Sequence, residues 1–319
     1  MHIPDGVITS GPVLAATWVV GAGGIALASR PFFRGLDETR TPLIGVLGAF
    51  IFAAQMVNFP LIGAPVSAHL VGTGLLTALL GPAVAIIVQS AVLLAQAILF
   101  QDGGLTAYGA NVMNLAVLPA VAGAAVLSGW PKRWRAAPIA IAVASAAGIV
   151  LATVGCGLQF ILSGEVDPEF FLTGLFTAQL VVAVAEGVIV ALVWIALRQR
   201  FGGELTVWPT PSESGPRSGK GWVLALSFLV CAAGATVASQ SPDTLEHFLE
   251  ETGVEASEPA PAPLPDYSVE GVSSEILSTF LAGSAGLLAT LGLLSLIGAV
   301  RRRGAPGSPT ETVDAPRVD

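Results

Sequence analysis

Long apolar stretches separated by short polar connections are the feature that most constrains the fold of this chain. They lie at 8–28, 41–59, 66–80, 83–100, 107–129, 138–162, 171–197, 221–239 and 277–299. A membrane-spanning helix needs about 20 apolar residues, and most of these stretches supply them. Only 11% of the 319 residues are charged, against roughly 25% in an average soluble domain. The sequence therefore predicts an all-α, polytopic membrane helix bundle of about nine spans.

The stretch at 66–80 is short for a span and is interrupted soon after by Gly81 and Pro82. Proline lacks a backbone N–H and disfavours helix in the residue before it. We therefore expect 66–80 to form a helical hairpin with 83–100, broken at Gly81-Pro82. A short segment at membrane depth is tolerated only where protein buries it or where it lines a cavity. Residues 60–80 are thus a place to expect a site.

The basic residues predict how the chain is oriented in the membrane. All 14 Lys and Arg residues fall into four groups, which share one side if the chain has nine spans. The groups are Arg30, Arg34 and Arg40; Lys132, Arg133 and Arg135; Arg198, Arg200, Arg217 and Lys220; and Arg301, Arg302, Arg303 and Arg317. The positive-inside rule makes that side cytoplasmic, with the N-terminus outside the cell membrane and the C-terminus inside. The net charge of −8 argues against a nucleic-acid partner.

The chain divides into two membrane parts. Residues 1–200 hold seven predicted spans, and residues 201–219, rich in Pro, Ser and Gly, are interpreted as a cytoplasmic linker. Residues 220–303 hold two spans around an acidic extracytoplasmic loop at 240–276. The composition of 304–319 predicts a disordered cytoplasmic tail.

The first two residues offer a set of nitrogen donors. The Met1 amine, the backbone nitrogen of His2 and Nδ1 of its imidazole can bind one ion, closing a five-membered and a six-membered ring. Because the amide nitrogen must lose its proton, this set suits square-planar Ni²⁺ or Cu²⁺, with Co²⁺ close behind. Neutral imidazole from His69 could supply a fourth nitrogen. Residue geometry alone, however, favours the plainer interpretation of His2 as an ordinary polar residue at a mobile terminus.

Other polar residues have two interpretations each. Asn111 and Asn114 share a helix face, where they either support a site from behind or form hydrogen bonds between helices. Asp102, followed by two glycines, is interpreted as a turn residue rather than a ligand. Glu186 is the acid inside a predicted span, which makes it a functional candidate, a partner of a buried polar group, or a contact for another subunit. His247 lies among acids and is interpreted as a solvated surface histidine.

Four ordered motifs resemble one family of membrane proteins. They are Met1-His2-Ile3-Pro4-Asp5-Gly6; Ser67-Ala68-His69-Leu70-Val71-Gly72-Thr73-Gly74; Leu80-Gly81-Pro82; and Gln101-Asp102-Gly103-Gly104-Leu105-Thr106-Ala107-Tyr108-Gly109-Ala110-Asn111-Val112-Met113-Asn114. Together they are similar to the CbiM/NikM family, the substrate-specific membrane components of energy-coupling-factor (ECF) cobalt and nickel importers. The matches span residues 1–118.

The C-terminal part resembles the small partner CbiN/NikN, which has two spans around an outer loop. Pro242-Asp243-Thr244-Leu245-Glu246 is similar to that family's Pro-Asp-Gly-Leu-Glu, with Thr244 in place of glycine. Pro263-Leu264-Pro265-Asp266-Tyr267 adds to the likeness. The two resemblances together imply a CbiMN/NikMN fusion.

The resemblance implies a transporter component rather than an enzyme, with metal bound by the Met1 amine, His2 and His69. Ni²⁺ or Co²⁺ would be the transported ion rather than a cofactor, and Ile3-Pro4-Asp5-Gly6 leans towards the nickel-type members. Energy would come from separate CbiO/NikO-like ATPase subunits through a CbiQ/NikQ-like coupling subunit, because the chain lacks the Walker A sequence GxxxxGK followed by Ser or Thr.

The alternatives are an intramembrane metal-dependent enzyme and a passive cation channel. No HExxH motif is present to support a zinc protease, and an N-terminal chelate has no role in a pore lined by repeated polar rings.

Overall fold

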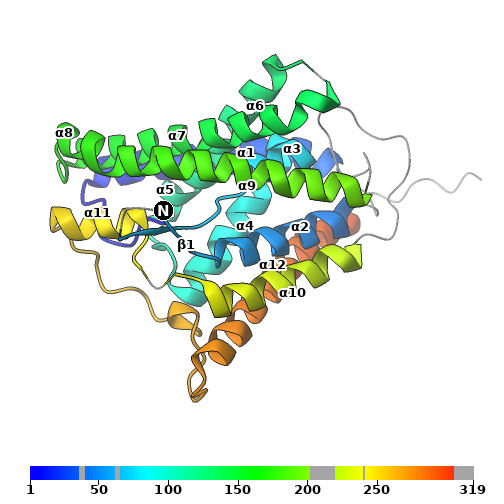
Figure 1. Ribbon diagram of the computed structural model, residues 1–319. Coiled ribbons are helices and arrows are strands. Elements are labelled where there is room, and N and C mark those ends of the chain that lie inside the picture. Colours follow the sequence, from blue (N-terminus) through cyan, green and yellow to red (C-terminus); the bar gives the residue numbers. More distant parts are fainter. Residues whose placement is uncertain (36–39, 62–64, 132, 202–219, 240, 305–319) are drawn as a thin grey trace, which may run out of the picture.

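The computed structural model describes the chain except for residues 36–39, 62–64, 132, 202–219, 240 and 305–319, and the described part is mostly helical (Figure 1). The helices are α1 Gly11–Gly35, α2 Arg40–Gln55, α3 Thr73–Leu80, α4 Pro82–Phe100, α5 Tyr108–Val112, α6 Leu118–Gly129, α7 Ala137–Ser163, α8 Pro168–Phe171, α9 Thr177–Phe201, α10 Lys220–Val237, α11 Thr244–Thr252 and α12 Glu275–Gly304. Two π-helical segments make α5–α6 and α8–α9 continuous, η1 Met113–Val117 and η3 Leu172–Phe176. Two 3-10 turns are η2 Trp134–Ala136 and η4 Pro265–Tyr267.

Six helices in the described part are long and apolar enough to cross a membrane. They are Gly11–Arg34, Pro82–Phe100, Tyr108–Gly129, Ala137–Ser163, Pro168–Gln199 and Glu275–Ala299. Thr41–Gln55 and Gly221–Val237 are shorter apolar helices. The prediction of an all-α, multi-pass membrane bundle is confirmed, whereas the count of nine spans and the orientation stay predictions.

The stretch at 66–80 differs from the expected helical span. Only its second half is helical, and α3, with 8 residues, is about 12 Å long and too short to cross a membrane. The first half is extended, and strand β2 Ser67–Ala68 pairs antiparallel with β1 Phe59–Pro60. Gly72 starts α3 with φ 77°, a left-handed conformation that favours glycine. As expected, the helices break at Gly81, and Pro82 opens α4.

The extended segment and α3 lie inside the bundle rather than on its surface. Every residue from 66 to 79 is buried, and α3 packs against α4, α6 and α7. Leu75, Leu76 and Leu79 form part of the main apolar core. The segment that carries His69 is therefore enclosed by protein, as a non-helical backbone near membrane depth must be.

The C-terminal helices pack onto the N-terminal part along one side. Helices α10 and α12 contact α2 and each other, and α12 also contacts α4 (Figure 1). Their connecting loop carries α11 to the end of the bundle near the N-terminus, where Asp243 lies beside Ser67 (Figure 1). The predicted linker at 201–219 and tail at 304–319 lie outside the described residues, apart from Phe201 and Gly304, which end α9 and α12.

Candidate metal centre

The N-terminal segment is held in place by hydrogen bonds to the loop and helix that follow α4. Asn111 clamps the backbone of Ile3: its Oδ1 accepts the Ile3 N–H at 2.8 Å, and its Nδ2 donates to the Ile3 carbonyl at 3.0 Å. The Gly104 N–H donates to the same carbonyl at 2.9 Å. The Ile3 side chain is fully buried. His2 is therefore part of a fixed segment and not of a mobile terminus.

Asp5 ties the same segment to the loop at a second point. Its carboxylate accepts the backbone N–H groups of Leu105 at 3.1 Å and of Thr106 at 2.7 Å. A Cβ atom on Gly104 would overlap Asp5, so this close approach requires glycine. The loop after α4 thus acts as a cradle for the first residues of the chain.

His69 is positioned by the residues that follow it. Glu186, in the middle of α9, accepts the Val71 N–H at 2.8 Å and the Gly72 N–H at 2.9 Å. The Val71 carbonyl accepts from the Gln55 side chain at 2.7 Å. Glu186 therefore pairs with buried backbone groups, which is one of the interpretations that the sequence left open.

The Met1 amine and the His69 imidazole meet in the interior. The amine nitrogen lies 2.8 Å from His69 Nε2 and 2.6 Å from an oxygen of Asp243. His69 Nδ1 is 3.2 Å from the Leu70 carbonyl, so Nδ1 carries the proton and the Nε2 lone pair faces the amine. Burial, then the charge of the amine, then His2, lowers the pKa of His69 to about 3. His69 is thus neutral near pH 7, the form that binds metal.

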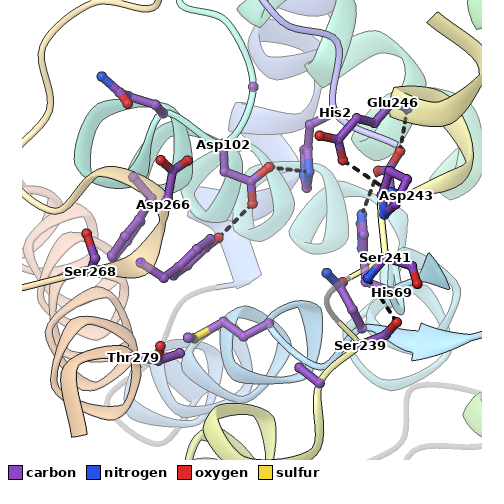
Figure 2. A pocket seen from close by; sticks show the side chains of 18 of the residues that line it. His2, His69, Asp102, Ser239, Ser241, Asp243, Glu246, Asp266, Ser268 and Thr279 are labelled. Carbon is purple, nitrogen blue, oxygen red and sulfur yellow. Dashed lines mark hydrogen bonds and ion pairs between the residues drawn. The ribbon is translucent and has the colours of Figure 1, made fainter. Parts of the chain in front are cut away.

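His2 lies beside His69 but uses its ring differently from the predicted chelate. The two rings are nearly parallel, with an interplanar angle of 5° and centroids 5.0 Å apart. His2 Nδ1 is 2.8 Å from an oxygen of Asp102 (Figure 2). Its Nε2 is buried without a partner among the described residues. The His2 backbone N–H likewise forms no hydrogen bond within the described part of the chain.

Two acidic residues complete the site, and the sequence interpretation missed both roles. Asp243 caps α11 through the N–H groups of Leu245 and Glu246 and presents its other oxygen to the Met1 amine. Burial raises the pKa of Asp243, but the amine and then His69 outweigh this effect and bring it to about 2. Asp102, interpreted as a turn residue, directs its carboxylate at His2. Burial also raises the pKa of Asp102, but His2 more than offsets this and holds it below the usual range.

The remaining candidates lie further from the site. Asn114 exchanges two hydrogen bonds with Gln159 of α7, at 3.0 and 2.8 Å, so it joins helices while Asn111 supports the N-terminal segment. His247 faces Glu250 and Glu251 on the outer side of α11. Within the described residues no group of three or more His, Cys, Asp or Glu side chains is placed to hold a metal ion. A metal site here therefore depends on the amine and backbone nitrogens.

A cavity of about 1470 Å³ opens beside these residues, between the N-terminal loops and the C-terminal unit (Figure 2). Its lining includes His2, His69, Asp102, Asp243, Glu246 and Asp266. No Lys or Arg is among the described residues that line it. A cavity of this charge attracts cations.

Comparison with known proteins decides the family. Residues 2–202 match the family described as the cobalt uptake substrate-specific transmembrane region, CbiM. The chain belongs to this family. Residues 220–303 match the PDGLE domain, so this CbiM protein carries the CbiN-like unit in the same chain, and the predicted CbiMN/NikMN fusion is confirmed.

Relatives of this CbiM protein include archaeal transport proteins. One from Archaeoglobus fulgidus, provisionally named fused nickel transport protein NikMN, is 31% identical over 303 residues, 92% of this chain and 96% of the relative. One from Haloquadratum walsbyi, provisionally named a metal transport protein, is 40% identical over 145 residues, 41% of this chain and 65% of the relative. A crystal structure of a truncated transition metal transporter aligns with TM-score 0.54 and 28% identity, covering 63% of this chain and 99% of that chain. The chain is thus a membrane component for cobalt or nickel transport and not an enzyme.

Proposed function

We propose that this chain captures Ni²⁺ or Co²⁺ at the outer face of the cell membrane through nitrogen atoms of Met1, His2 and His69. The observation that carries the proposal is the 2.8 Å distance between the Met1 amine and His69 Nε2. Two nitrogen ligands at right angles, each about 2 Å from one ion, lie about 2.8 Å apart. The pair is thus already spaced as two neighbouring ligands would be.

His2 supplies the remaining donors in this proposal. Its backbone N–H is free of hydrogen bonds within the described residues, so loss of that proton breaks no contact of the fold. Its Nδ1 faces Asp102, and a 180° turn about the Cβ–Cγ bond exchanges Nδ1 with Cδ2 in the same space. The predicted chelate through Nδ1 therefore requires this turn, because the ring otherwise offers only Nε2.

Nickel is the favoured ion in this proposal. The relative that aligns with 92% of the chain is named for nickel, and a planar set of nitrogen donors with a deprotonated amide suits Ni²⁺. The family description names cobalt, so the two ions need a direct comparison. Purified protein exposed to equal Ni²⁺ and Co²⁺ and then analysed for metal content should retain more nickel. Preferential retention of cobalt would reverse the assignment.

Transport in this proposal needs partner subunits of an ECF importer, namely ATPase subunits and a coupling membrane subunit. The support is the absence of a Walker A sequence from the chain, which leaves it without its own phosphate-binding loop. Cells that express the chain with both partners should accumulate radioactive nickel, and cells that carry the His69→Ala variant with the same partners should not. Equal uptake by that variant would contradict the proposed site, and full uptake without the ATPase would contradict the proposed energy source.

A further inference from the structure

Three donor atoms beside the cavity surround one point. The Met1 amine nitrogen lies 2.8 Å from His69 Nε2 and 2.6 Å from the Oδ2 atom of Asp243, and the last two atoms are 4.0 Å apart. A circle through three atoms at these distances has a radius of about 2.0 Å, the usual distance of a divalent first-row ion from nitrogen and carboxylate ligands. Seen from its centre, His69 and Asp243 lie on nearly opposite sides, and the amine is close to a right angle from each. The three atoms thus occupy three corners of a square plane.

Asp243 is held in this position by the start of α11 and faces the cavity. Its Oδ1 atom accepts the N–H groups of Leu245 at 2.7 Å and of Glu246 at 2.8 Å, which leaves Oδ2 for the amine. The Asp243 side chain is 19% exposed, against 5% for Met1 and 7% for His69. A second cavity of about 10 Å³, close to the space that one water molecule needs, adjoins all three residues. An ion that enters from the large cavity therefore meets Asp243 before the two nitrogen donors.

The other acid near His2 is already occupied. The Oδ1 atom of Asp102 lies 2.8 Å from His2 Nδ1, and its Oδ2 atom accepts the Tyr267 hydroxyl at 2.6 Å (Figure 2). Asp102 would have to give up one of these contacts to bind an ion. The partner of Asp243 Oδ2 is instead the Met1 amine, which becomes a ligand of the same ion.

The proposed nitrogen chelate cannot form in a single step from this arrangement. The His2 ring has to turn, and the His2 amide has to lose its proton, whereas a carboxylate is deprotonated already. In the complete chelate the amide nitrogen lies between the amine and Nδ1, so the corner opposite the amide belongs to His69. The amide corner is thus beside the amine and opposite His69. The Oδ2 atom of Asp243 now lies at this corner.

We propose that Asp243 is a ligand of the ion in a first complex with the Met1 amine and His69, and that the His2 amide nitrogen later replaces it. The inference rests on the proposed function and adds a step before the complete chelate. Water from the cavity fills the remaining positions of the first complex. One proton leaves the Met1 ammonium as the first complex forms, a second leaves the His2 amide as the carboxylate is replaced, and both pass to water. The C-terminal unit thereby supplies a ligand for loading and none to the final complex.

The test measures the rate of nickel loading. The full-length chain is mixed rapidly with Ni²⁺ alone, and the ligand-field absorption band of planar nickel is followed in time. Asp243→Asn removes the charged oxygen but keeps the start of α11, because asparagine also caps helices. Glu250→Gln is the matched control, since it removes an equal charge from α11 and from the wall of the same cavity. A variant with one residue added before Met1 reports on the proposed function itself.

Asp243→Asn should load about tenfold or more slowly, because a lost ligand costs at least as much as a lost outer partner, and it should reach the wild-type final band. Glu250→Gln should load at close to the wild-type rate. If Asp243 only neutralised the ammonium, its loss would ease deprotonation of the amine, so equal or faster loading by Asp243→Asn contradicts the first complex. Equal slowing in both variants would assign the effect to the charge of the cavity instead. A changed final band would show that the carboxylate stays bound and is not replaced.

The extended variant separates the two proposals. If it loses nickel while Asp243→Asn loads like the wild type, the first complex is wrong and the proposed function stands. If the extended variant loads like the wild type, the proposed function fails, and the first complex with it. Should Asp243→Asn not fold, Asp243→Ser gives the same decision, because serine also caps helices and carries no charge.

Discussion

The Nε2 atom of His69 lies 2.8 Å from the amine nitrogen of Met1, although 68 residues separate them in the chain. Two supports hold the segments that carry them. Asn111 clamps the backbone of Ile3, and Glu186 holds the two N–H groups that follow Leu70. Substitution of a supporting residue should weaken Ni²⁺ binding less than substitution of a ligand does, and the predictions below use this difference.

His69→Ala should weaken Ni²⁺ binding by more than about 100-fold, because loss of a ligand costs more than loss of an outer partner. The matched control is His247→Ala, which removes a partly exposed imidazole on α11 that lies beside Glu250 and Glu251. Titration against a competing chelator measures both. Equal affinities for the two variants would remove His69 from the site.

Asn111→Ala should weaken Ni²⁺ binding about tenfold, because the Ile3 backbone loses both hydrogen bonds to the side chain and His2 gains freedom. Asn114→Ala is the control, since Asn114 pairs with Gln159 and not with the N-terminal segment. Both variants should lose stability, whereas only the first should lose affinity. A parallel loss of affinity in both would mean that general loosening of the bundle, and not the clamp, is responsible.

Glu186→Gln should lower the free energy of unfolding by about 1 to 3 kcal/mol, because one amide oxygen replaces two carboxylate oxygens and one buried N–H loses its acceptor. The segment after His69 should then loosen and Ni²⁺ affinity should fall. Glu250→Gln, on the exposed face of α11, serves as control. Thermal unfolding and metal titration of the same preparations give both quantities, and unchanged values for Glu186→Gln would refute the support that we assign to it.

Asp243 should make the metal-free protein sensitive to acid. Burial raises its pKa, but the Met1 amine and then His69 lower it to about 2 from the ordinary 3.8. The stability it contributes, on the order of 2 kcal/mol, is present above pH 4 and is lost as the pH falls to about 2. Between those values the melting temperature of the wild type should fall further than that of Asp243→Asn, which keeps the cap on α11 because asparagine caps helices well. Identical pH profiles would show that the ion pair contributes nothing.

The helical bundle could be predicted from the sequence, whereas the role of His2 and His69 as ligands stays a prediction. Apolar stretches of span length identify most helices, and Pro82 after Gly81 marks a helix break that the structure contains. His2 and His69 are grouped in the sequence analysis as nitrogen donors and by resemblance to a family, and the structure places their rings side by side. The extended form of residues 66–72 was not predictable, because their apolar composition is that of a span. Their backbone is instead satisfied by Gln55 and Glu186, which lie on other helices.

The acidic residues of the site could not have been placed from the sequence. Asp243 is 242 residues from Met1, and Tyr267 is 165 residues from Asp102. Both contacts arise where the C-terminal loop folds over the N-terminal part, a relation that neither helical periodicity nor local spacing encodes. The spacing of Asp243 and Glu246 is typical of a capping box at the start of a helix, and the structure contains this cap on α11. The spacing did not indicate that the second carboxylate oxygen of Asp243 contacts the Met1 amine.

The most direct test of the account is the Ni²⁺ affinity of a variant with one glycine added before Met1. The added residue turns the Met1 amine into an amide and moves the charge away from His69 and Asp243. We expect affinity to fall by more than about 100-fold, while a glycine added after Asp319 changes nothing and both proteins insert and unfold like the wild type. Wild-type affinity in the N-terminally extended protein would show that the amine is not a ligand.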